Sequence, residues 1–120
     1  MPSQLPALPL HTTASGKTFL AFGASKPGKL DRLGPGTITR HEDLRRDLYL
    51  TRQRGYALSN EEWQADIGAL AAPVFDASAR CVAAVAVTVP VLRIRSADSI
   101  SMARACVDCA QRISERLGYI

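Results

Sequence analysis

The segment Gly16-Lys17-Thr18 has the residue types that end a phosphate-binding loop, whose pattern is G-x-x-x-x-G-K-[ST]. In that loop the first glycine lets the backbone turn tightly around the phosphates. Here His11 stands where the first glycine is required, and no other glycine lies between it and Gly16. The preceding segment PSQLPALPL holds three prolines, which do not fit the buried strand that leads into such a loop. The pattern therefore argues against a nucleotide site.

A helix over residues 12–22 is the alternative interpretation of the same stretch. Thr12 or Thr13 supplies a side-chain oxygen suited to the N-cap. Gly23 stands where a helix commonly ends. The residues expected on the buried side of this helix are Ala14, Phe19, Leu20 and Phe22.

Other reactive side chains lack the partners that their chemistry requires. Cys106 and Cys109 have C-x-x-C spacing inside a helical pattern, without further zinc ligands or the strand that precedes a redox helix. Ser15 lacks the G-x-S-x-G setting of a nucleophile. Glu61 and Glu62 point apart on an extended chain, so we expect them in a solvated turn. No catalytic residue, metal site or cofactor is predicted.

An enzyme would need a histidine within hydrogen-bond reach of a serine or cysteine and of an acid. The chain offers His11 and His41, and His11 has no acidic neighbour in the sequence. Trp63 is expected to be a partly buried anchor, with stacking on a ligand as the alternative. Arg93 and Arg95 would face the same way on an extended chain and could contact a neighbouring subunit or an acid.

Composition restricts the class of protein. A chain of 120 residues with 47% apolar residues is one domain at most and can pack a core. No apolar run has the length of a membrane span, and the first residues do not resemble a secretory signal, so we expect a cytoplasmic protein without membrane contact. The net charge is +4, but eight basic and four acidic residues are intermixed over residues 26–54. This mixture indicates a solvated helix face rather than a nucleic-acid surface.

Further helices and strands follow the chain in a clear order. The spacing of Thr39 and Glu42 matches a capping box and predicts a helix that Gly55 ends. A short strand starts at residues 56–58. Residues 68–75 and 81–89 predict a hairpin around a turn at 76–80, and Pro90 closes it.

Both faces of the second hairpin strand are apolar, so we expect both to be covered. The last helix is expected to begin near Ser96 and to stop at Gly118, with one side formed by Ile100, Ala103, Val107, Ala110, Ser114 and Leu117. The order of elements predicts an α+β fold with an antiparallel sheet of about three strands.

Several segments together resemble the IclR-type transcriptional regulators. LPLHTTASGKTFLAF is similar to the family signature PLHATASGKALLA, and TITRHEDLRRDLYLTRQRGYALSNEE is similar to TI…LRAELARVRARGYAVDDEE. IGALAAPVFDASARCVAAVAVTVP resembles GLRCIAAPVFDASGRVVAALSVSGP, and ISERLGY resembles the closing helix. The segments keep the family order from Leu8 onward.

The resemblance implies a regulator of two domains. An N-terminal winged helix-turn-helix binds an operator, and a C-terminal GAF-like domain binds a small effector and makes oligomer contacts. Residues 1–120 resemble only the later part of that effector domain, so we expect a GAF/profilin-like antiparallel sheet flanked by helices and incomplete at its N-terminal side. DNA contact would come only through a helix-turn-helix domain absent from this chain. The expected partners are a small organic acid and further copies, as a homodimer or homotetramer.

The resemblance also implies an effector pocket. The helix that begins at Ala14 and Ser15 would lie beside it, where exposed N–H groups can hold a carboxylate. Where relatives that bind small keto acids have a polar or acidic residue after the Gly-Tyr strand, this chain has Ser59. Their cysteine corresponds to Ala69, and their two serines correspond to Ala86 and Thr88. The candidate ligand-binding residues are therefore Ala14, Ser15, Ser59, Ala69, Ala86 and Thr88.

This set of side chains is less polar than that of the keto-acid sensors. An apolar wall with a few polar points suits an aromatic or branched carboxylate. The alternative to a sensor is a truncated structural or oligomerising remnant, with a collapsed pocket and a dimer formed through exposed sheet or helix surface. An incomplete sheet leaves unpaired edges that favour such pairing.

Overall fold

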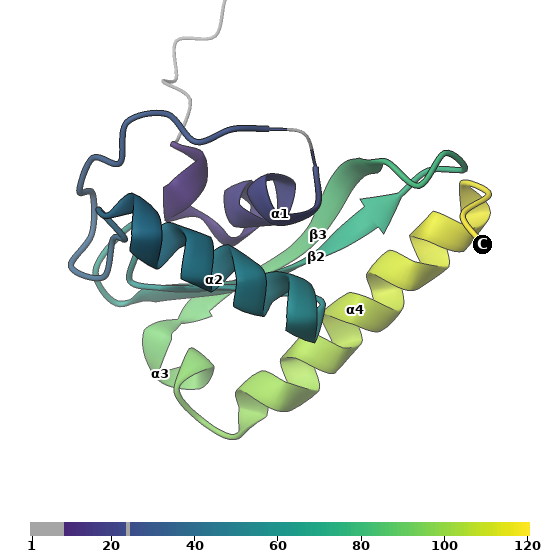
Figure 1. Cartoon of the computed structure of the whole chain (residues 1–120). Helices are drawn as coiled ribbons and strands as arrows, with labels where there is room; N and C mark the ends of the chain where they lie inside the picture. The colour runs from purple at the N-terminus through teal and green to yellow at the C-terminus, as the bar shows by residue number, and fades with distance from the viewer. Residues whose placement is uncertain (1–8, 24) are drawn as a thin grey trace, which may run out of the picture.

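The computed structural model describes residues 9–23 and 25–120, so most of the proline-rich lead-in lies outside the described residues (Figure 1). The predicted α+β class with an antiparallel sheet is confirmed. In chain order the elements are the 3-10 helix η1 (Leu10–Thr12), α1 (Ala14–Phe22), α2 (His41–Arg54), β1 (Ala57–Asn60), β2 (Ile67–Phe75), β3 (Cys81–Pro90), α3 (Val91–Ile94) and α4 (Asp98–Arg116).

The sheet has the strand order β1-β2-β3, and both pairs are antiparallel. Ala71 at the centre of β2 is opposite Ala57 of β1 and Ala86 of β3. The predicted turn between β2 and β3 is confirmed, and Asp76 shapes it. The Asp76 carboxylate accepts hydrogen bonds from the backbone N–H groups of Ser78 at 2.8 Å and Arg80 at 3.1 Å, as aspartate commonly does in turns.

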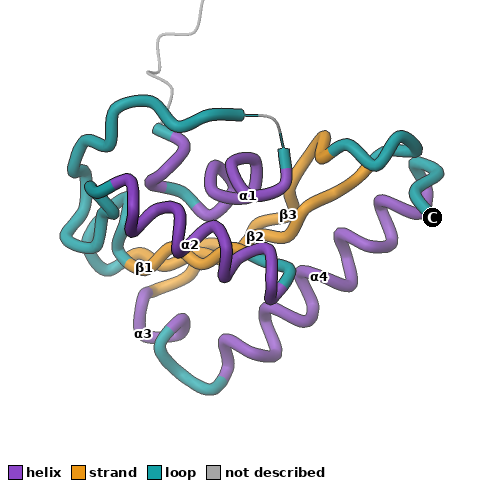
Figure 2. Tube along the Cα trace, in the orientation of Figure 1, coloured by secondary structure: helices purple, strands orange, loops and turns teal. Residues whose placement is uncertain are grey.

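Helices cover the sheet on both sides, and Figure 2 shows the strands between α1 and α4. Side chains of β2 alternate between the two faces. Leu70, Ala72 and Val74 pack with the buried residues of α4, whereas Ala71 packs with Ala14 of α1. Helix α2 packs on α1 through Leu44, Leu48, Leu20 and Ala21, and Leu30 of the loop between the two helices joins this cluster. The face that carries α1 therefore includes every position of the predicted pocket.

The predicted capping box at the start of α2 is wrong. The helix begins at His41 with Arg40 as its N-cap, and no side chain caps it. The Glu42 carboxylate forms an ion pair with the Arg40 guanidinium, so it is not engaged in a reciprocal bond to a threonine. The predicted end of α2 is confirmed, because Gly55 adopts φ +89° and donates its N–H to the Thr51 carbonyl at 2.9 Å.

The last part of the chain differs from the prediction in two respects. The turn of helix α3 was not foreseen, and α4 begins at Asp98 rather than at Ser96. The Ser96 hydroxyl still accepts a hydrogen bond from the Asp98 N–H at 3.2 Å. The buried side of α4 consists of Ala103, Cys106, Ala110 and Ser114, whereas the predicted Ile100 and Leu117 are exposed.

The expectation that both faces of β3 are covered is also wrong. None of the residues Cys81–Pro90 is fully buried, and Val82 remains 49% exposed. The strand lies at the edge of the sheet and pairs only with β2 among the described residues. Helix α1 covers the neighbouring positions of β2 but leaves Ala86 and Thr88 open. Apolar residues on both sides of a strand therefore do not show that other elements cover both of its faces.

The edge of β2 beyond β1 is protected by specific groups. Since β1 starts at Ala57, opposite Ala71, the last residues of β2 have no strand beside them on that side. Pro73 has no N–H group to offer there. The N–H of Phe75 is engaged, because it donates to the hydroxyl of Ser114 on α4 at 2.9 Å.

Candidate functional site

A hollow of about 330 Å³ lies between the N-terminus of α1 and the sheet. All residues predicted to bind ligand lie on its wall, and the wall also includes residues that the sequence did not single out as ligand contacts. Among the described residues, the lining consists of Thr12, Thr13, Ala14, Ser15, Ser59, Trp63, Ile67, Ala69, Ala86 and Thr88. We call this hollow the α1 pocket.

The register of the sheet explains how three of these residues meet. Ser59 is opposite Ala69, and Ala69 is opposite Thr88, so they form one row across the three strands. Residues directly opposite one another in antiparallel strands point to the same face. Their distant sequence positions thus converge on one side of the sheet.

The first turn of α1 forms the other wall. The Thr13 hydroxyl accepts a hydrogen bond from the Gly16 N–H at 2.9 Å, and the Thr13 carbonyl accepts from the Lys17 N–H at 2.9 Å. The first N–H groups of an α-helix have no acceptor one turn earlier. The N–H groups of Ala14 and Ser15 are therefore the helix donors available at the pocket, at the positive end of the helix dipole.

The polar side chains of the α1 pocket differ in what they can still bind. Ser59 is buried, and its hydroxyl donates to the Thr12 carbonyl at 3.2 Å, so it can only accept a further hydrogen bond. The hydroxyls of Ser15 and Thr88 make no hydrogen bond to the other described residues. Ser15 and Thr88 thus have hydroxyl groups free to donate to a ligand.

The Gly16-Lys17-Thr18 segment has a structural role within the fold. All three residues are buried. A Cβ atom on Gly16 would lie 2.2 Å from the Leu10 carbonyl oxygen, so glycine permits the close contact between η1 and α1. The Thr18 hydroxyl donates to the Ala14 carbonyl at 2.9 Å. None of these groups is presented to a phosphate.

Lys17 forms the centre of a buried charge cluster that sequence analysis missed. Its side chain is 0% exposed, and its ammonium lies 2.8 Å from Asp47 Oδ2 on α2 and 2.8 Å from Glu62 Oε1 after β1. The first contact is a directed hydrogen bond, whereas the second is an ion pair without hydrogen-bond geometry. The cluster ties α1 to α2 and to the loop that carries Trp63.

The prediction of a solvated turn is wrong for Glu62, which is only 7% exposed. Its second carboxylate oxygen accepts from the Asn60 N–H at 3.0 Å, and its carbonyl accepts from the Thr37 hydroxyl at 2.6 Å. The neighbouring Glu61 is oriented differently and pairs with Arg95. No local pattern marks Glu62 as buried, because its charged partners are supplied by α1 and α2.

Burial raises the pKa of the Glu62 carboxyl, and the nearby Lys17 ammonium only partly opposes this effect. A carboxyl whose pKa is higher in the folded state contributes stability that is lost as pH rises above its ordinary value of 4.5. We therefore expect the Glu62→Gln variant to gain stability relative to wild type as pH rises from about 4 to 8. Urea unfolding across that range measures the difference in the free energy of unfolding. A loss of stability of the variant relative to wild type as pH rises would show that the Lys17 ammonium affects the Glu62 pKa more than burial does.

The remaining candidate side chains have structural contacts. His11 is buried with Nε2 2.9 Å from the Asp31 carbonyl oxygen, and His41 is exposed at the start of α2. Trp63 is half-buried, as expected, and lines the α1 pocket. Arg93 and Arg95 do not lie on an extended chain, because α3 occupies that segment.

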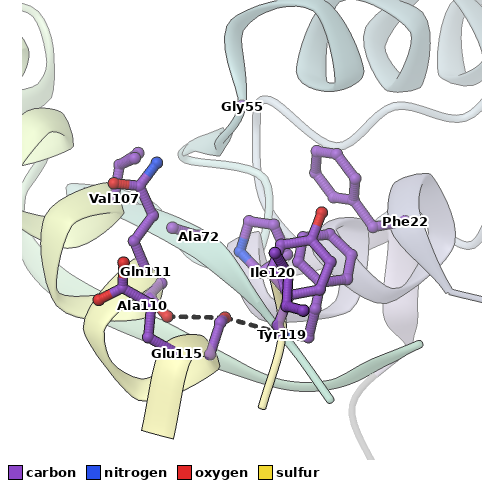
Figure 3. Close-up of a pocket in the computed structure, with 12 residues that line it drawn as sticks. Phe22, Gly55, Ala72, Val107, Ala110, Gln111, Glu115, Tyr119 and Ile120 are labelled. Carbon is purple, nitrogen blue, oxygen red and sulfur yellow. Dashed lines mark hydrogen bonds between the residues drawn. The ribbon is translucent and has the colours of Figure 1, made fainter. Parts of the chain in front are cut away.

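A second and larger hollow of about 680 Å³ lies at the other end of β2 (Figure 3). Phe22 and Tyr119 lie on one side of it, and Val107 and Gln111 of α4 lie on the other. Phe75 contacts both aromatic rings, with ring centres 6.0 Å from Phe22 and 5.0 Å from Tyr119. The buried polar side chain of this hollow is Ser114. Its hydroxyl already donates to the Ala110 carbonyl and accepts from the Phe75 N–H. The α1 pocket differs from this hollow in having a helix N-terminus and free hydroxyl groups on its wall.

The family model of the bacterial transcriptional regulator IclR C-terminal region matches residues 6–115. The chain belongs to the IclR family. A glycerol operon regulatory protein from Streptomyces griseus is 39% identical over 92% of this chain and 46% of its own length. The chain spans less than half the length of the first curated relatives that it matches.

Solved IclR structures share the fold. The IclR protein of Thermotoga maritima superposes with a TM-score of 0.83 at 34% identity, over 99% of this chain and 51% of that one. An IclR homologue from Microbacterium hydrocarbonoxydans, solved with 4-hydroxybenzoate, gives a TM-score of 0.72 at 26% identity, over 91% of this chain and 47% of that one. The relatives are named as transcriptional regulators, so this chain is a regulator domain rather than an enzyme. Within residues 9–23 and 25–120, no helix is both long and apolar enough to cross a bilayer.

Proposed function

We propose that this chain is the effector-sensing domain of an IclR-type regulator and that the α1 pocket binds a small aromatic or branched carboxylate. The observation that carries this proposal is the meeting of a helix N-terminus, two free hydroxyls and an apolar sheet face in one hollow. Helix N-termini favour anions because N–H groups and the helix dipole both point toward them.

Each part of the α1 pocket then has a distinct role. The N–H groups of Ala14 and Ser15, with the Ser15 hydroxyl, hold the carboxylate. Ala69 and Ala86 supply the apolar floor, and Trp63 offers an aromatic wall. On the sheet, the Thr88 hydroxyl and the Ser59 hydroxyl oxygen provide polar contacts to the ligand on either side of Ala69.

The size and composition of the pocket support this ligand class. A volume of about 330 Å³ is at the lower end of the range for small-molecule sites. The 4-hydroxybenzoate bound by the Microbacterium homologue is a compact aromatic carboxylate. That observation belongs to the homologue and motivates the choice of ligands for the test.

The whole regulator would contact DNA through a helix-turn-helix domain outside these 120 residues and act in the cytoplasm as a homodimer or homotetramer. The alternative is a structural remnant that oligomerises without binding an effector. The exposure of β3 supports this alternative, because an open strand edge can pair with another chain.

Thermal unfolding against a panel of aromatic, branched and keto acids tests the proposal. An acid at about 100 times its dissociation constant adds about 2.7 kcal/mol of stability, which raises the midpoint of a domain of this size by several degrees. Ala86→Phe, which fills the α1 pocket, is expected to abolish the shift.

Gln111→Phe is the matched control, because it places the same side chain in the larger hollow. The proposed site requires this variant to keep the full ligand shift. Loss of the shift in Gln111→Phe alone would assign binding to the larger hollow instead. A cooperative melt without a shift for any acid would favour the structural remnant.

A further inference from the structure

Among the residues that the structure describes, Trp63 is the only aromatic side chain in the lining of the α1 pocket. The other lining residues are threonine, alanine, serine and isoleucine. The Trp63 indole is therefore the flat surface against which a ring in the pocket can stack. It belongs to the connection of residues 61–66 between β1 and β2, which we call the Trp63 loop. The position of this loop determines whether the pocket has an aromatic wall.

The two ends of the Trp63 loop have left-handed backbone without glycine. The angle φ is +56° at Glu61 and +68° at Asp66, a conformation that persists where surrounding contacts impose it. The loop before α2 provides such contacts from one side. The Gly36 N–H donates to the Glu61 carbonyl at 2.9 Å, and the Thr37 hydroxyl donates to the Glu62 carbonyl at 2.6 Å. The shape of the Trp63 loop thus depends on contacts with other elements.

The ion pair between Lys17 and Glu62 joins the Trp63 loop to α1. Its two atoms are 2.8 Å apart, and the side chains are 0% and 9% exposed. Glu62 directly precedes Trp63. Lys17 lies within one helical turn of Ala14 and Ser15, whose N–H groups are available at the pocket. Because water does not compete for these buried charges, the ion pair holds the aromatic wall at a defined place relative to the helix N-terminus.

We propose that the Lys17–Glu62 ion pair positions Trp63 as the aromatic wall of the α1 pocket, so that the site selects aromatic over aliphatic carboxylates. The first turn of α1 sets the place of the ligand carboxylate, and the Trp63 loop sets the place of its ring. A flat ring stacks on an indole face more closely than a puckered ring of the same size. The selection rests on the proposed function, whereas the positioning of Trp63 does not.

The ligand-free test uses the fluorescence of Trp63, the only tryptophan of the chain. Glu62→Gln and Asp47→Asn each remove one carboxylate charge from the Lys17 ammonium and keep the shape of the side chain. Because burial raises the pKa of the Glu62 carboxyl, a neutral side chain is compatible with this position, and we expect both variants to fold cooperatively.

Acrylamide is expected to quench Trp63 faster in Glu62→Gln than in wild type, because the Trp63 loop loses its charged link to α1. Asp47→Asn is the matched control and is expected to keep the wild-type quenching rate. Asp47 belongs to α2, which contributes no residue to the described lining of the α1 pocket. The comparison therefore separates the position of Trp63 from the general loss of a charge in the cluster.

The ligand test compares the dissociation constants of benzoate and cyclohexanecarboxylate, which carry the same carboxylate on a flat and on a puckered ring. We expect wild type to bind benzoate about fivefold more tightly, the typical size of an aromatic pair contribution. The preference is expected to be lost in Glu62→Gln and in Trp63→Leu and to be kept in Asp47→Asn. Adding Glu62→Gln to Trp63→Leu should cause no further loss, since Glu62 acts through Trp63.

The outcomes distinguish the positioning from the proposed function. Equal quenching in wild type and Glu62→Gln would overturn the positioning, as would an equal increase in Glu62→Gln and Asp47→Asn. Equal affinity of wild type for the two acids would overturn the selection and leave a carboxylate site in place. A wild-type chain that binds neither acid would contradict the proposed function and the selection with it, while the quenching rates would still decide whether the ion pair positions Trp63.

Discussion

Replacing Lys17 with Met is expected to lower the free energy of unfolding by about 3–5 kcal/mol at neutral pH. The ammonium is fully buried and lies 2.8 Å from the carboxylates of both Asp47 and Glu62. Methionine fills a similar volume but leaves the two carboxylates facing each other without a cation. Removal of one partner from a buried ion pair is costly because the remaining charge is neither solvated nor compensated.

Urea unfolding at neutral and acidic pH measures this effect. The loss is expected to shrink at acidic pH, because burial raises the pKa of the Glu62 carboxyl and its protonation removes one of the two negative charges. Lys29→Met is the control, since Lys29 forms an ion pair with Asp31 on the surface with its side chain 88% exposed. Exposed pairs contribute little. Equal losses for both variants would show that the Lys17 cluster does not stabilise the fold.

Gly16→Ala is expected to destabilise the domain by about 3 kcal/mol, the upper range for overpacking in a well-packed interior. An added methyl group would lie 2.2 Å from the Leu10 carbonyl oxygen and 2.7 Å from its Cα atom. These are backbone atoms, so a side-chain rotation cannot relieve the contact. At an unconstrained helix position the same change would stabilise by roughly 1 kcal/mol, so the expected sign is opposite to that of helix propensity.

Denaturant unfolding of Gly16→Ala compared with Gly28→Ala isolates the contact. Nothing lies within 4 Å of a Cβ atom at Gly28, so that variant should keep wild-type stability. The steric account also predicts that any folded Gly16→Ala protein loses ligand-induced stabilisation, because displacement of η1 moves Thr12 and Thr13 in the pocket wall. Unchanged stability and binding in Gly16→Ala would contradict it.

Local sequence patterns predicted most of the secondary structure. Gly55 and Gly118 mark helix ends with positive φ angles, which glycine adopts without strain. Asp76 and the apolar segments around it are sufficient to identify the hairpin. The exact start of α2 and α4 was less predictable, because Thr39, Arg40 and Ser96 all offer local alternatives within two residues of the helix.

The location of the pocket was predictable for a different reason. Ser59, Ala69 and Thr88 fall on one row because the strand register fixes them. Family resemblance supplied these positions, and the structure supplies the register. Their binding role stays a prediction. Glu62 could not be foreseen, since its burial depends on Lys17 and Asp47 from two other elements. The exposure of one face of β3 was equally unpredictable, because apolar composition does not show which helix covers a strand.

Because Lys17 is buried, its reaction with a reagent in solution reports local unfolding of the protein. The chain contains only three lysines, and the other two, Lys26 and Lys29, are exposed. An amine-reactive label in water can therefore reach those two at once, but it reaches Lys17 only when the contacts among α1, α2 and the loop after β1 are broken. The rate at which Lys17 acquires a label thus follows the opening of this region, and mass spectrometry can read it beside two built-in references in the same molecule.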